Sequence, residues 1–113
     1  MSLDIGVGAK VDVGNPEVEY VHVGKEFNIT HNVTAMWEKA GCYDALYESH
    51  GKLVSEILPD LRSALQKMQD NPAEFIALNP ANGWGSYPVA VQFLSEVIDE
   101  FCKYPKAVVV VSR

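Results

Sequence analysis

Positive charge is scarce in this chain. Fifteen acidic residues stand against nine basic ones, and the formal net charge is −6. A surface that binds nucleic acid needs clustered lysine and arginine to release phosphate counterions, and the sequence shows no such cluster. We therefore expect neither nucleic acid nor an anionic membrane surface among the partners.

Long apolar runs and paired cysteine motifs are also missing. No apolar run approaches the ~20 residues of a transmembrane helix, and the N-terminal segment lacks the basic and apolar regions of a signal peptide. Cys42 and Cys102 lie far apart in partly apolar helical runs, which predicts two buried free thiols rather than a disulfide. These features together predict a cytoplasmic protein.

The sequence patterns of catalysis and cofactor binding are absent as well. Gly6 and Gly8 supply only a fragment of G-x-G-x-x-G, and no C-x-x-C or H-x-x-x-H pair offers metal ligands. The nucleophile elbow G-x-S-x-G does not occur, and Ser86 is better explained as a helix cap. We predict no catalytic residue, no metal and no cofactor, and expect a non-enzymatic protein.

The N-terminal third of the chain carries the period of β-strands. Three segments alternate apolar and polar residues: 3–13, 18–23 and 27–31. A Gly-Asn-Pro turn at residues 14–16 joins the first two into a hairpin, and a turn at Gly24-Lys25 would separate the third. The sequence thus predicts three short strands before the first helix.

Helical signals dominate the middle of the chain. Five segments show them: 35–40, 43–47, 53–68, 73–78 and 87–103. The third and the fifth are long and amphipathic. Thr34, or in competition Asn32, is the expected N-cap of the first helix, and Ser86 that of the last. Pro59 either lies in the first turn of the third helix or kinks it.

The last apolar run, residues 107–111, contains four consecutive valines. A β-branched run without alternation predicts a strand covered on both faces, and because such a run on an open edge would promote aggregation, we expect an interior strand. The order of strands, helices and a returning strand predicts one α+β domain, 1–113. We expect a two-layer sandwich, with an antiparallel or mixed sheet of three to four strands and two long helices on one face.

Two polar segments are candidate binding sites. One is the end of the third strand, rich in amides and hydroxyls, although these groups also close turns and cap helices. The other is the loop LNPANGWGSY, residues 78–87, where Trp84 stands between two glycines. Trp84 either folds back as a buried plug, which aromatic burial favours, or stays exposed for recognition. We expect the two segments to share a recess, and the predicted ligand-binding residues are Asn28, His31, Asn32, Thr34, Asn79, Asn82, Trp84, Tyr87 and Arg113.

Three motifs carry a resemblance. N-x-T-x-N-V-T-x-M-W at residues 28–37, N-P-x-N-G-W-G-x-Y at 79–87 and the final V-S-R resemble a group of small uncharacterised bacteriophage and prophage proteins. The resemblance covers most of the chain from Phe27 and implies an accessory protein acting in the host cytoplasm. It transfers no catalytic residue.

We therefore predict a phage-type accessory protein that binds a small molecule, nucleotide-like in character, or a host protein. A neutral polar segment and a glycine-flanked tryptophan without catalytic partners motivate this prediction. The alternatives are a structural or assembly protein that forms a homo-oligomer such as a dimer, and an enzyme whose site the sequence does not reveal.

Overall fold

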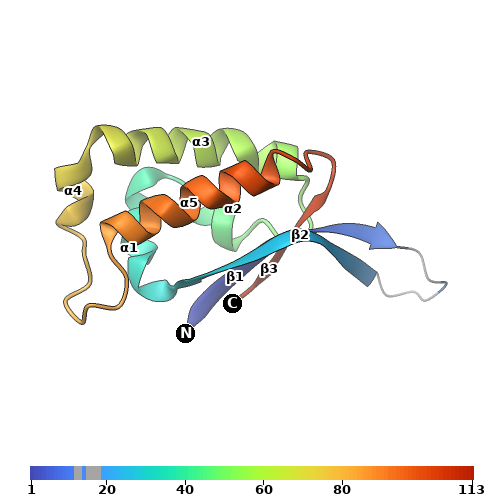
Figure 1. Cartoon of the computed structure of the whole chain (residues 1–113), viewed down its shortest axis with the longest axis horizontal. Helices are drawn as coiled ribbons and strands as arrows, with labels where there is room; N and C mark the ends of the chain where they lie inside the picture. The colour runs from blue at the N-terminus through green and yellow to red at the C-terminus, as the bar shows by residue number, and fades with distance from the viewer. Residues whose placement is uncertain (12–13, 15–18) are drawn as a thin grey trace.

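The computed structural model describes residues 1–11, 14 and 19–113 (Figure 1). The predicted turn at Asn15-Pro16 lies outside them. The described residues form a sheet of three antiparallel strands in the order β2-β1-β3 and a set of helices that pack against it. The strands are β1 (Ser2–Val11), β2 (Glu19–Thr30) and β3 (Val108–Ser112). The helices are α1 (Thr34–Ala40), α2 (Tyr43–Tyr47), α3 (Val54–Asp70), α4 (Pro72–Ile76) and α5 (Tyr87–Phe101), preceded by a 3-10 turn, His31–Val33.

The helices cover one face of the sheet, which confirms the predicted α+β class. Helix α5 contacts β2 and β1, and α3 packs on α5, so the two long helices lie on the same side of the sheet (Figure 1). On β1 the odd positions Leu3, Ile5 and Val7 face this core and are 0–1% exposed, as a period of two requires. The C-terminal end of β1 and the N-terminal end of β2 extend beyond the helices (Figure 1).

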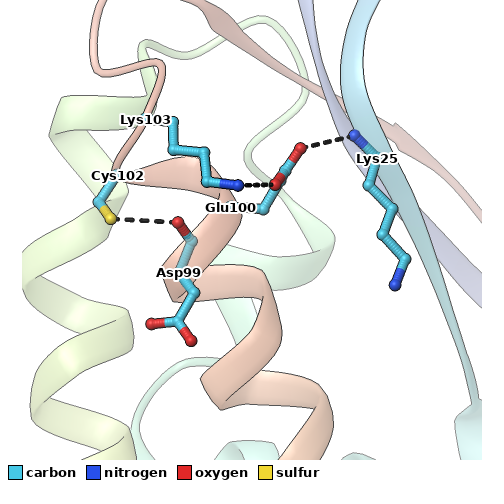
Figure 2. A network of polar contacts seen from close by, with 5 residues as sticks. All are labelled: Lys25, Asp99, Glu100, Cys102 and Lys103. Atoms are coloured by element: carbon cyan, nitrogen blue, oxygen red, sulfur yellow. Dashed lines mark hydrogen bonds and ion pairs between the residues drawn. The ribbon is translucent and has the colours of Figure 1, made fainter.

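The predicted turn at Gly24-Lys25 is wrong, because β2 continues through it to Thr30 as one strand. The pairing with β1 shifts register at this point, where Gly24 has a φ of 69°. The backbone N–H of Lys25 donates to Oε2 of Glu100 at 2.8 Å, and Nζ of Lys103 donates to Oε1 of the same carboxylate at 2.9 Å (Figure 2). The bonds from Lys103 and Lys25 hold the pKa of Glu100 below its ordinary value. Glu100 of α5 therefore stabilises the register shift in β2, at a place where the neighbouring sequence alone predicts a turn.

The valine run forms an edge strand, so the prediction of an interior strand is wrong. Its outer side is covered by an irregular segment of residues 50–53. The N–H of Val109 donates to the carbonyl of Lys52 at 2.8 Å, and the N–H of Gly51 donates to the carbonyl of Val109 at 2.8 Å. The N–H of Val111 donates to Nδ1 of His50 at 3.0 Å. The edge is thereby protected from pairing with other chains.

The predicted caps of the first helix are also wrong. Thr34 is the first residue of α1, and Val33 occupies the cap position. Asn32 lies within the 3-10 turn, and its N–H donates to Oγ1 of Thr30 at 3.2 Å. Pro59 lies inside α3, in its second turn, because the helix begins at Val54.

The two cysteines are free thiols, but only one of them is buried. Burial raises the pKa of the Cys42 thiol to about 12. Cys102 is exposed just after α5, where its Sγ lies 3.2 Å from the carbonyl of Asp99 (Figure 2). The prediction of burial is therefore right for Cys42 and wrong for Cys102. Within the residues that the structure describes, no helix is long and apolar enough to span a membrane.

Candidate functional site

Trp84 is exposed, so of the two alternatives left open for it the favoured one, a buried plug, is wrong. Its side chain is 71% exposed. The residues on either side of it, Gly83 (φ 75°) and Gly85 (φ 94°), have left-handed backbone conformations. Oδ1 of Asn82 accepts a hydrogen bond from the Trp84 N–H at 3.0 Å. The loop thus uses an amide side chain and two glycines to present an indole to solvent.

The absence of a side chain at Gly85 lets the loop lie against the end of β2. A Cβ at this position would be 2.9 Å from Cγ2 of Thr30 and 2.9 Å from Cγ1 of Val33. Two non-bonded carbons prefer a separation of about 3.5–4.0 Å, so a Cβ at this position would clash with both side chains. Gly85 therefore brings the loop to the polar segment that leaves the sheet.

The far end of the loop is held by hydrogen bonds to Tyr87. Oδ1 of Asn79 accepts from the Tyr87 N–H at 2.8 Å, and the Tyr87 hydroxyl donates to the Met68 carbonyl of α3 at 2.8 Å. Ser86 occupies the N-cap position of α5 as predicted, yet in the described part of the chain its side chain makes no capping hydrogen bond. The amide of Asn79 takes that role instead, so both ends of the loop are fixed to helices.

A recess with a volume of about 650 Å³ opens between Trp84 and the end of β2. Its lining residues come from the N-terminus, β2, the 3-10 turn and the loop: Met1, Ser2, Asn28, Thr30, His31, Asn32 and Trp84. Nδ2 of Asn28 donates to Oγ of Ser2 at 2.9 Å and to Oδ1 of Asp4 at 2.7 Å, which fixes the amide on the sheet. The two polar segments thus meet around one recess.

Four of the nine predicted ligand-binding residues line this recess: Asn28, His31, Asn32 and Trp84. The remaining five are placed elsewhere: Thr34, Asn79, Asn82, Tyr87 and Arg113. Asn79, Asn82 and Tyr87 brace the loop, and Thr34 begins α1. Arg113 pairs with Glu48, with Nη1 3.0 Å from Oε1, and lies over the Tyr47 ring at 5.9 Å.

Three lining residues are not in the predicted ligand-binding set: Thr30, which belongs to the polar segment expected at this place, and Met1 and Ser2, which sequence reasoning missed. The register sets Ser2 opposite Thr30, so the start of β1 necessarily lies beside the end of β2. That alignment follows from the hairpin, but the irregularity at Gly24 makes the register impossible to count from sequence.

The recess combines amide, hydroxyl and imidazole side chains with Met1 and the indole of Trp84. Among the described residues no lysine or arginine lines it, and no group of three or more His, Cys, Asp or Glu side chains in them is arranged to hold a metal ion. Nε2 of His31 is buried without a hydrogen-bond partner in the described structure, and the ring meets Tyr47 edge-on at 5.4 Å. The recess offers amide and hydroxyl groups beside one aromatic face.

Comparison with family models, with curated proteins and with solved structures finds no match for this chain. The resemblance to small phage proteins therefore stays a prediction.

Proposed function

We propose that the protein is a non-enzymatic, phage-type accessory protein of the host cytoplasm. Its recess between Trp84 and the end of β2 binds a small, uncharged planar molecule of the nucleobase or nucleoside kind. The observation that carries this proposal is an indole, 71% exposed, on the rim of a recess whose lining includes amide, hydroxyl and imidazole side chains. Its volume of about 650 Å³ falls in the ordinary range for ligand sites.

The side chains that line the recess favour an uncharged ligand over a nucleotide. A phosphate group is normally bound by lysine, arginine or a helix N-terminus, and within the described chain the lining contains no lysine or arginine. The Asp4 carboxylate, bonded to the Asn28 amide, adds negative charge close by. The nucleotide-like ligand suggested by the sequence is therefore narrowed to the base or nucleoside.

Stacking on the indole and hydrogen bonds to fixed amides would supply the affinity. A base stacked on an aromatic side chain contributes about 1–3 kcal/mol. Rotation of the His31 ring toward a ligand would give its buried Nε2 a partner, and an unsatisfied buried polar atom costs about 1–3 kcal/mol.

The experiment is a titration of the protein with adenine, adenosine and adenosine monophosphate, and with the matching uracil series. We expect bases or nucleosides to raise the melting temperature and to quench Trp84 fluorescence, and the monophosphates to bind more weakly. The Trp84→Ala variant should lose binding without losing stability, because the ring is exposed. Val89→Ala, which removes another exposed side chain (49%) outside the recess lining, is the matched control. Unchanged binding in Trp84→Ala contradicts the proposal.

The same exposed indole supports a second candidate, recognition of a host protein, since exposed tryptophans anchor protein interfaces. It is favoured if no compound of the panel binds while Trp84→Ala abolishes a complex with a host protein in size-exclusion chromatography. The alternative of assembly through the final valine strand receives less support, because residues 50–53 already bond to its outer edge.

A further inference from the structure

The central strand β1 extends beyond one of its two neighbours. β2 pairs with it as far as Val11, whereas the pairing with β3 ends at Gly8 opposite Val108. In the part of the chain that the structure describes, no strand pairs with residues 9–11 on the β3 side. This part of β1 belongs to the hairpin that projects from the body (Figure 1). Successive residues of a strand point their N–H and C=O groups alternately to its two sides, so alternate residues of this stretch face the open side and offer a short template for another strand.

A groove with a volume of about 390 Å³ runs along this open edge. One wall is formed by β1 from Gly8 to Lys10, and the other by Leu53, Glu56 and residues 106–108. Leu53 is 43% exposed, and it is held in place by its backbone bridge to Val108. The groove therefore combines an open strand edge with an apolar side chain that a partner can cover.

We propose that this groove is a docking site for an extended, acidic peptide segment of another protein, which adds to β1 as a further strand. In this mode of recognition main-chain hydrogen bonds give affinity and pockets for alternate side chains give specificity. Apolar side chains of the peptide would cover Leu53, and its carboxylates would lie near Lys10 and Lys106. Two lysines against the single Glu56 make the lining locally positive on a chain of net charge −6.

The same charges disfavour a second copy of this chain as the occupant. A two-fold antiparallel pairing of residues 9–11 with their own copy would set Lys10 opposite Lys10. Like charges directly opposite one another destabilise a strand pair. The site is also separate from the recess, with which it shares no lining residue.

The test uses the acetylated, amidated hexapeptide VDVDVD and the isotope-labelled full chain. We expect the backbone amide signals of residues 9–11 to shift on titration, and hydrogen exchange to slow at those amides of this stretch that face the open side. The peptide VKVKVK should bind more weakly, and VDVDVD with alternate backbone nitrogens methylated should not bind. No binding of VDVDVD at millimolar concentration, equal binding of VKVKVK or of the methylated peptide, or shifts confined to β2 would each overturn the proposal.

Charge-reversal variants test the role of the two lysines. Lys10→Glu and Lys106→Glu should each weaken VDVDVD binding about two- to fivefold, the range expected for one exposed ion pair. Lys39→Glu makes the same charge change on an exposed residue of α1, outside the groove lining, and should leave the affinity within error of the native chain. Equal weakening by all three variants would show a general charge effect and refute docking at this groove.

Discussion

Replacing Gly85 by alanine should destabilise the protein more than the same replacement at Gly83, and should displace Trp84 from the recess. The two glycines flank the same indole and both have positive φ, 94° and 75°. They differ in their surroundings. A Cβ at 85 would be 2.9 Å from side-chain carbons of Thr30 and Val33, whereas among the described residues a Cβ at 83 would meet no atom within 4 Å.

The expected magnitudes follow from these two environments. A left-handed backbone costs an alanine about 1–2 kcal/mol, and the reduced entropy of the unfolded chain offsets about 0.4–1 kcal/mol. Gly83→Ala should therefore lower the free energy of unfolding by about 1 kcal/mol. Gly85→Ala adds overpacking, which costs about 1–3 kcal/mol, and should lower it by about 2–4 kcal/mol in total.

Urea denaturation followed by far-ultraviolet circular dichroism gives the two free energies of unfolding. Quenching of fluorescence by acrylamide reports the position of the loop, because Trp37 is fully buried and Trp84 is 71% exposed. In Gly85→Ala we expect altered quenching and weaker ligand binding, and in Gly83→Ala neither. Equal losses of stability at the two positions would refute the idea that close approach at Gly85 sets the recess.

Three further predictions concern single side chains. Because the pKa of Glu100 is lowered in the folded state, its contribution to stability is present above its ordinary pKa and is lost as the pH falls through the lowered value. The native chain should therefore be more stable than Glu100→Gln at neutral pH, and thermal melts of both proteins between pH 2 and 7 should show this difference shrinking in acid. Burial raises the pKa of the Cys42 thiol to about 12, so iodoacetamide should label Cys102 alone in the folded protein, and mass spectrometry of Cys102→Ser should find no modification until urea is added. Tyr87→Phe removes the hydroxyl that donates to α3 and should cost about 0.5–1.5 kcal/mol in urea denaturation; an unchanged midpoint would mean that this bond does not hold the loop.

Where the period of the sequence determines burial, the structure follows it closely. The predicted buried stripe of α5 is buried at every position: Ala90, Phe93, Leu94, Val97, Ile98 and Phe101. The alternation on β1 is equally reliable, because one face of that strand meets the helices along Leu3, Ile5 and Val7. In both cases the pattern itself contains the physical cause, a single apolar face.

Predictions failed where a distant partner decides the local structure. The glycine at position 24 is equally compatible with a turn and with an irregularity inside a strand, and the bond from Lys25 to Glu100, 75 residues away, selects the second. The valine strand tolerates an edge because the His50 side chain and the backbone of residues 51–52 cover it. Neither partner can be identified by reading the neighbouring sequence.

The candidate site shows the same division. The segments around Asn28 and Trp84 share a recess, as expected. Asn79 and Asn82 belong to the predicted ligand-binding set, but in the folded chain their side-chain oxygens accept hydrogen bonds from backbone N–H groups of their own loop. An amide near a turn serves the backbone first, and the sequence alone does not distinguish this use from binding.

The two proposed sites lie toward opposite ends of β1, with Ser2 in the lining of the recess and Gly8, Ala9 and Lys10 in that of the groove. At about 3.3 Å per residue, Ser2 and Lys10 are about 26 Å apart along the strand. Groups this distant usually contribute independently, so Trp84→Ala should leave VDVDVD binding unchanged and Lys106→Glu should leave nucleoside binding unchanged. Loss of both activities in either variant would show that the two ends of β1 are coupled, and would contradict a sheet that serves only as a rigid support.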